Sequence, residues 1–150
     1  MLRKTFAIIS LSAFLICVYL LVTGSQILVK PLYKGSGLPC GTIITWIGLI
    51  AFPASVLFGI KKILDPDKSI LRILNIVIKV NILLGLAWGF ISYYLAGNWA
   101  FTFTPQNDFR GSTAASIYFF SFTLVIAILP LICLAVFLVH SLISRLQNKR

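Results

Sequence analysis

The chain has 150 residues, 59% of them apolar, and a formal net charge of +10. Its mean hydropathy of +1.02 excludes an ordinary soluble domain, in which only about 45–50% of residues are apolar. The basic residues lie in small groups beside apolar runs, which leaves no soluble surface to form a phosphate-binding stripe. We therefore expect no nucleic acid partner and predict a membrane protein whose basic residues meet anionic lipid headgroups.

Four apolar stretches predict an all-α membrane protein, a bundle of four transmembrane helices. The spans are expected at about 5–22, 43–60, 76–96 and 114–139. Each approaches or exceeds the ~20 residues that a helix needs to cross a bilayer. Together they use over half of the chain, so we expect one polytopic membrane domain over residues 1–150.

The first stretch could also be a cleaved signal peptide, because Arg3 and Lys4 precede it. However, its apolar run from Thr5 to Val22 exceeds the roughly 7–15 residues of a typical signal-peptide core. We therefore expect this stretch to remain as the first span.

Lys and Arg are divided unevenly between the connecting segments. If the N-terminus is cytoplasmic, nine of the 13 basic residues lie in cytoplasmic segments, and the outer segments hold only Lys30, Lys34 and Arg110. Because basic residues favour the cytoplasmic side, we expect both termini in the cytoplasm. Aromatic rings favour the headgroup boundary, and several lie at the predicted outer ends: Tyr19, Trp46, Tyr93, Tyr94, Trp99 and Tyr118.

The third span is preceded by an amphipathic segment at 69–79. We expect the turn at 65–69 to lead into a helix that Asp67 or Ser69 caps. Basic and polar residues then follow at spacings of four, three and four, which places them on one helix face: Lys68, Arg72, Asn75 and Lys79. Lys79 is either an intramembrane charge that serves an ion path or a partner's carboxylate, or a side chain that extends to the inner headgroups. The absence of Asp and Glu from every predicted span favours the second interpretation.

Small residues indicate how the helices pack. The third span carries a GxxxG pattern at Gly85 and Gly89, with Asn81 one turn before it. Close backbone approach and interhelical hydrogen bonds drive helix association in lipid. We favour packing among the four helices of the chain; the alternative leaves one face, in particular that of Gly85 and Gly89, free for a partner helix. A second face of small residues lies on the second span: Gly48, Ala51, Ser55 and Gly59.

The outer loop from Gly97 to Thr113 is rich in aromatic residues, with Trp99, Phe101 and Phe103 close together. It is either a lid packed across the bundle or a recognition surface for a membrane partner. In the second case Arg110 belongs to the same surface.

The reactive groups are few. The chain has one histidine, His140, and its three acids lie in predicted loops. This leaves no pair for general acid–base catalysis within the membrane and no set of metal ligands. We expect no enzymatic activity and no cofactor.

A basic chain with four spans and both termini inside resembles the immunity proteins of pore-forming colicins, of the colicin A and B type. The charged inner turn at 61–72 and the outer loop at 97–113 match that architecture in size and placement. The resemblance implies a bacterial inner-membrane protein that binds the helices of a pore-forming toxin laterally and keeps its channel closed. It assigns no role to individual residues.

Two classes of function follow. The favoured one is a non-catalytic inner-membrane protein that acts through helix–helix contacts with a membrane partner, such as a membrane-inserted toxin or a larger complex of which the chain is an accessory subunit. The alternative is a small oligomeric transporter or flippase with a polar path near Lys79. The candidate partner or polar-path residues are Lys79, Asn81, Gly85, Gly89, Trp99, Phe101, Phe103 and Arg110.

Overall fold

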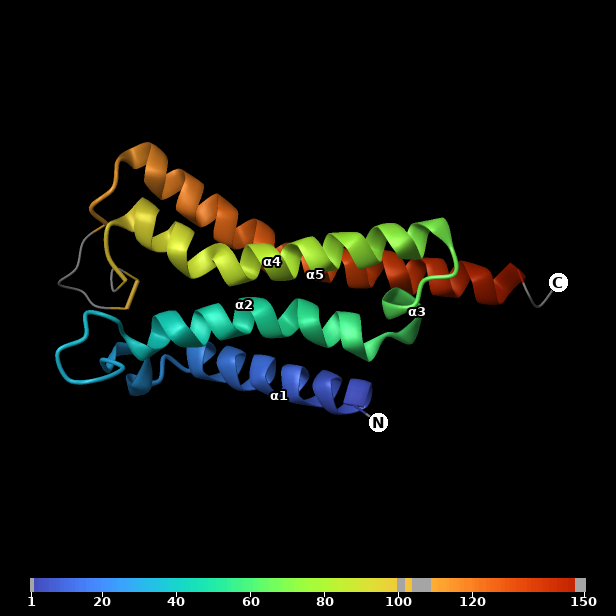
Figure 1. The fold of residues 1–150 in the computed structure, drawn as a ribbon, viewed down its shortest axis with the longest axis horizontal. Helices are drawn as coiled ribbons and strands as arrows, with labels where there is room; N and C mark the ends of the chain where they lie inside the picture. The colour runs from blue at the N-terminus through green and yellow to red at the C-terminus, as the bar shows by residue number, and fades with distance from the viewer. Residues whose placement is uncertain (1, 100–101, 104–108, 148–150) are drawn as a thin grey trace.

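The protein is described from a computed structural model that covers residues 2–99, 102–103 and 109–147 (Figure 1). The described part is all-α, as predicted. Four helices are long and apolar enough to cross a membrane: α1 (Leu2–Val22), α2 (Cys40–Gly59), α4 (Ser69–Ala96) and α5 (Thr113–Gln147). Two short segments join them, the 3-10 helix η1 (Gln26–Val29) and the single turn α3 (Lys61–Leu64).

Two of the long helices extend beyond the predicted spans. The segment 69–79 and the third span form one continuous helix of 28 residues, α4, and α5 has 35 residues. At ~1.5 Å per residue these helices are ~42 Å and ~52 Å long, whereas the hydrocarbon core of a bilayer is ~30 Å thick. The end of α5 from His140 to Gln147 contains no glycine or proline, so the helix continues after the apolar run has ended.

Helix α2 is the centre of the bundle. It packs against α1 on one side and against α4 and α5 on the other (Figure 1). Within the described ranges, α1 makes no close backbone contact with α4 or α5, and Cys17 is its only buried residue. Helix α1 is therefore held along one narrow edge, and most of its surface is uncovered.

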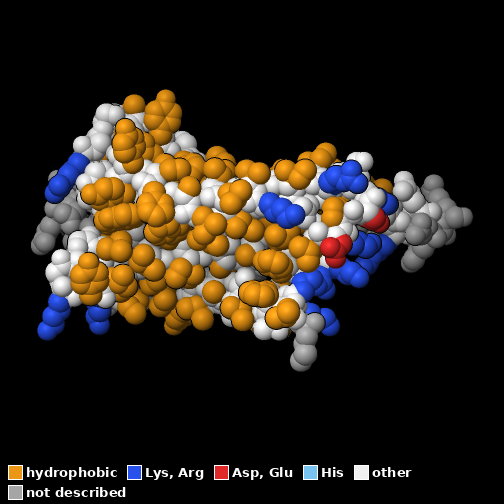
Figure 2. Space-filling model, in the orientation of Figure 1, with side chains coloured by type: hydrophobic (Ala, Val, Ile, Leu, Met, Phe, Trp, Pro, Cys, Tyr) orange, Lys and Arg blue, Asp and Glu red, His pale blue; other side chains and the backbone are white. Residues whose placement is uncertain are grey.

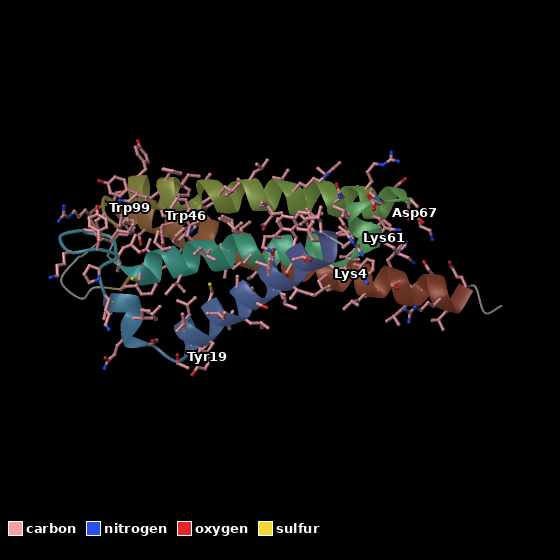
Figure 3. All side chains as sticks on the ribbon, turned by 60° about the horizontal axis from the view of Figure 1, so that its bottom comes forward. Lys4, Tyr19, Trp46, Lys61, Asp67 and Trp99 are labelled. Atoms are coloured by element: carbon pink, nitrogen blue, oxygen red, sulfur yellow. The ribbon has the colours of Figure 1, made fainter. Side chains whose placement is uncertain are left out.

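The two ends of the bundle differ in their side chains. Lys4, Lys61 and Asp67 lie at one end, with the two termini, and Trp46 and Trp99 lie at the other (Figures 1 and 3). We call these the basic end and the loop end. Between them, the face shown in Figure 2 is largely apolar, and most of its Lys and Arg side chains are grouped at the basic end.

Helix α4 lies opposite the two proline interruptions of its neighbours. Pro53 in α2 and Pro130 in α5 lack the N–H that would bond the carbonyl four residues earlier. In α5 this carbonyl belongs to Ile126, and Asn81 Nδ2 of α4 donates to it at 3.2 Å. The interhelical bond thus satisfies a backbone group that the proline leaves free.

Gly85 of α4 lies opposite the other proline interruption. In α2 the carbonyl that Pro53 leaves free belongs to Leu49. A Cβ built on Gly85 would lie only 3.4 Å from that oxygen, so the missing side chain brings the backbones of α4 and α2 together.

The start of α4 differs from the predicted cap and polar stripe. The N-cap residue is Lys68, and it makes no side-chain cap bond, so the expectation that Asp67 or Ser69 caps the helix is wrong. Arg72 and Lys79 are exposed, whereas Asn75 is buried. Its Nδ2 donates to the carbonyls of Ile63 at 2.7 Å and Leu64 at 3.2 Å. The amide therefore bonds the free carbonyls at the end of α3.

Candidate functional site: a groove along α2

A groove runs along α2 between α1 and α5. Its loop-end half has a volume of 400 Å³ and its basic-end half 280 Å³, and Phe52 lines both halves. Between Thr45 and Ile60, which line opposite ends, an α-helix rises about 22 Å. The groove therefore follows most of one membrane crossing.

Small residues of α2 form the floor of the groove. Gly48, Ser55 and Gly59 line it, and they belong to the small-residue face expected on the second span. Cys17 Cβ of α1 lies 3.2 Å from where a Gly48 Cβ would be, whereas nothing lies within 4 Å of the same position at Gly59. The floor is thus covered by α1 near Gly48 and open at Gly59.

The walls of the groove are apolar. They come from α1 and α5 and include Leu11 and Val18 on one side and Ala127, Leu131 and Leu134 on the other. Val18 and Leu131 are exposed. Among the described residues, α1 and α5 make no close backbone contact, so the two walls are separate along the groove.

A cavity of 140 Å³ adjoins the groove at the loop end. Thr45 and Thr123 line both spaces. The Thr123 hydroxyl accepts from Trp88 Nε1 at 2.8 Å and donates to the Phe119 carbonyl at 2.8 Å. The buried hydroxyls of Thr45 and Ser92 have no hydrogen-bond partner among the described residues. The cavity therefore combines aromatic walls with two unsatisfied polar groups.

The outer loop folds over this cavity. Trp99 stacks on Tyr93 with ring centroids 4.7 Å apart, and its carbonyl accepts from Thr42 Oγ1 at 2.6 Å. Phe103 lines the cavity, and its ring lies so close to Gly41 that a Cβ there would approach it to 2.6 Å. Trp99 and Phe103 thus lie where a lid would place them. Phe101 lies outside the described residues.

Arg110, the other candidate in this loop, is exposed. Its N–H donates to the Ala96 carbonyl at 3.0 Å, and its Cβ packs at 3.1 Å from the position of a Cβ on Gly97. Gly97 has φ +71°, which glycine adopts without strain. The backbone of Arg110 therefore fixes the end of α4, and its side chain is open to solvent or headgroups.

The Gly85 and Gly89 face of α4 is covered by α2. Trp46 Nε1 donates to the Gly85 carbonyl at 2.8 Å, and the six-membered ring of Trp46 occupies the space that a Cβ on Gly89 would need. This placement agrees with packing inside the chain rather than with a face left free for a partner.

Lys79 and Asn81 lie in different environments. Lys79 is exposed, whereas Asn81 is fully buried and bonded to Ile126. In a span of ~20 residues that ends at Ala96 and crosses a ~30 Å core, the first residue is near 77, so Lys79 lies only about half a turn inside the basic end of that span. A lysine side chain can reach the interface from there.

The groove and the role of Trp46 were not predicted from the sequence. The small-residue face of α2 was visible in the sequence, but the separation of α1 from α5 has no sequence signal. The bond from Asn81 to Ile126 did have one, because the carbonyl four residues before Pro130 requires a donor.

Within the described ranges there is no group of three or more His, Cys, Asp and Glu side chains that could hold a metal ion. No protein-family model, curated protein or solved structure matches the chain.

Proposed function

We propose that this chain is a non-catalytic integral inner-membrane protein that receives a transmembrane helix of a partner in the groove between α1 and α5. The observation that carries the proposal is an apolar groove about 22 Å long with Gly48, Ser55 and Gly59 on its floor.

A helix fits this groove better than lipid does. Where the floor is open, at Gly59, a small residue lets the backbones of two helices approach closely, which is how helices associate in a bilayer. Near the loop end, the buried hydroxyl of Thr45 has no hydrogen-bond partner among the described residues.

The architecture favours a membrane-inserted toxin as the partner. A four-span, basic chain of the colicin immunity type acts laterally, on helices of the toxin that are already in the bilayer. Such binding needs no catalytic group, and it needs an unoccupied helix-binding face on the side of the bundle. An accessory subunit of a larger membrane complex would use the same face.

A toxin challenge tests the proposal. The chain is expressed in a sensitive bacterial strain, and survival is measured against a panel of pore-forming toxins. We expect protection against one of them, lost when Ala127→Trp or Gly59→Leu fills the groove. Ala135→Trp is the matched control, because Ala135 is an exposed residue of α5 that does not line the groove.

Two results would count against the immunity version: protection against none of the toxins, or equal protection by the groove variants and the control. In the accessory-subunit version, the same three variants are compared for recovery of the complex in mild detergent. There the groove variants should lose the complex, and Ala135→Trp should keep it.

The transporter alternative has less support. It requires Lys79 and Asn81 to line one path, but Lys79 is exposed and Asn81 is bonded to a backbone carbonyl of α5. Strict dependence of a transport activity on Lys79 would favour that alternative.

A further inference from the structure

A second cavity, of 290 Å³, lies at the basic end, at the opposite end of the bundle from the 140 Å³ cavity beneath the outer loop. It opens between the α3–α4 turn and the last turns of α5. Helix α3 contributes Lys62, the turn that follows it contributes Asp67 and Lys68, and α5 contributes His140, Ser141 and Ser144.

Helix α5 turns its polar face inward here. His140, Ser141 and Ser144 are half-buried and line the cavity, whereas Leu142 and Ile143 are exposed. A soluble helix would place these two faces the other way round. These side chains therefore offer hydrogen-bonding groups to the space between α5 and the start of α4, where a polar ligand can bond them.

The lining of the cavity is suited to an anion. Two basic residues, Lys62 and Lys68, and one acid, Asp67, line the cavity, so its charged side chains carry a net positive charge. In the part of the chain that the structure describes, no ion pair joins either lysine to a carboxylate. Ammonium, imidazole and hydroxyl groups all donate hydrogen bonds, and an ionised phosphate diester only accepts them.

The start of α4 adds further donors. Lys68 and Leu71 line the cavity, and the N-cap Lys68 makes no side-chain cap bond. The first backbone N–H groups of α4 therefore have no side-chain acceptor among the described residues. Helix N-termini favour anions through these N–H groups and through the helix dipole.

We propose that this cavity binds a phosphate group, presented by an anionic phospholipid headgroup or by a free phosphate. The lipid is the source that the position favours, because exposed Leu142 and Ile143 on the outer face of α5 can contact acyl chains while the cavity holds the headgroup. Basic pockets between helices on the cytoplasmic side suit such headgroups. The proposal is independent of the groove, which lies between α1 and α5.

Native mass spectrometry of the purified full chain tests the proposal with three probes: phosphatidylglycerol, phosphatidylcholine and inorganic phosphate. The cavity variant is Lys62→Gln with Lys68→Gln. The matched control is Lys61→Gln with Arg72→Gln, which removes the same charge from exposed neighbours that do not line the cavity.

We expect phosphatidylglycerol to bind the wild-type chain and phosphatidylcholine to bind weakly. The cavity variant should bind phosphatidylglycerol about ten-fold more weakly, because it loses charge-assisted hydrogen bonds, and the control by less than about two-fold. Competition by inorganic phosphate supports the site with lipid as its source. Binding of inorganic phosphate alone supports the site with free phosphate as its source.

Equal losses in the two double variants would overturn the proposal, because they would indicate diffuse attraction rather than a site. The proposal would also be overturned if the wild-type chain bound neither phosphatidylglycerol nor inorganic phosphate. If the cavity variant does not fold, Ser141→Leu fills the cavity without changing the charge, and Leu142→Ser is its control. Unchanged phosphatidylglycerol binding by Ser141→Leu would also overturn the proposal.

Discussion

Asn81 and Pro130 are expected to be energetically coupled. Asn81 Nδ2 bonds the Ile126 carbonyl, which is free because residue 130 is a proline. In a Pro130→Ala background the N–H of residue 130 can bond that carbonyl itself. The change Asn81→Leu should therefore cost more stability in the wild-type chain than in the Pro130→Ala variant.

The expected size of this coupling is about 1 kcal/mol. Interhelical hydrogen bonds in membranes are worth about 0.6 kcal/mol on average and up to about 1.7, and here the proline removes the N–H that would otherwise bond the carbonyl within its own helix. Asn81 Oδ1 has no partner among the described residues, so Asn81→Leu also removes an unsatisfied acceptor. That contribution is the same in both backgrounds and cancels in the double-mutant cycle.

The assay is unfolding of the purified protein in bicelles by steric trapping, for the wild-type chain, both single variants and the double variant. A cycle with Pro53→Ala in place of Pro130→Ala is the control, because the carbonyl freed by Pro53 belongs to Leu49 and faces Gly85. This control should be additive within about 0.5 kcal/mol. Equal costs of Asn81→Leu with and without Pro130 would refute the assignment of the bond.

Two further predictions concern single residues. Gly89→Ala should destabilise the bundle by about 1–3 kcal/mol, because the new Cβ meets the Trp46 ring. Gly59→Ala should be neutral or slightly stabilising, because the space beside Gly59 is open. Unfolding by steric trapping measures both variants, and equal effects on the free energy of unfolding would contradict these two expectations. Lys79→Leu should change the free energy of unfolding by less than about 0.5 kcal/mol and leave protection against the toxin intact, since Lys79 is exposed and near the interface. A loss of function in this variant would instead support the transporter alternative.

The sequence predicted the helices of this fold better than it predicted which helices pack against each other. Hydropathy and length were enough for four apolar helices, because each signal lies within one segment. Helix α5 continues beyond the predicted span, because hydropathy marks the edge of the apolar run and not the end of the backbone hydrogen bonds. Asn75 was expected beside Arg72 and Lys79 on one polar face. It is buried because the free carbonyls of Ile63 and Leu64 lie next to it.

Pairing between helices was harder to predict. Two faces of small residues were visible, on the second and third spans, and nothing in their spacing distinguished them. In the structure α2 covers Gly85 with Leu49 and Ile50 and covers Gly89 with Trp46, whereas the small residues of α2 itself line the groove. The difference depends on where α1 packs, which is a tertiary property with no local signal.

Site-specific photo-crosslinking in living cells tests most directly whether the groove receives a partner helix. A photoreactive residue is placed at Leu131, which lines the groove, or at the neighbouring Ile132, which does not; the two side chains are almost equally exposed, at 53% and 52%. We predict an adduct to one identified membrane-inserted partner from position 131, in a transmembrane segment of that partner, and none from position 132. Adducts of equal yield from both positions, or an adduct from position 131 to lipid alone, would contradict the proposal.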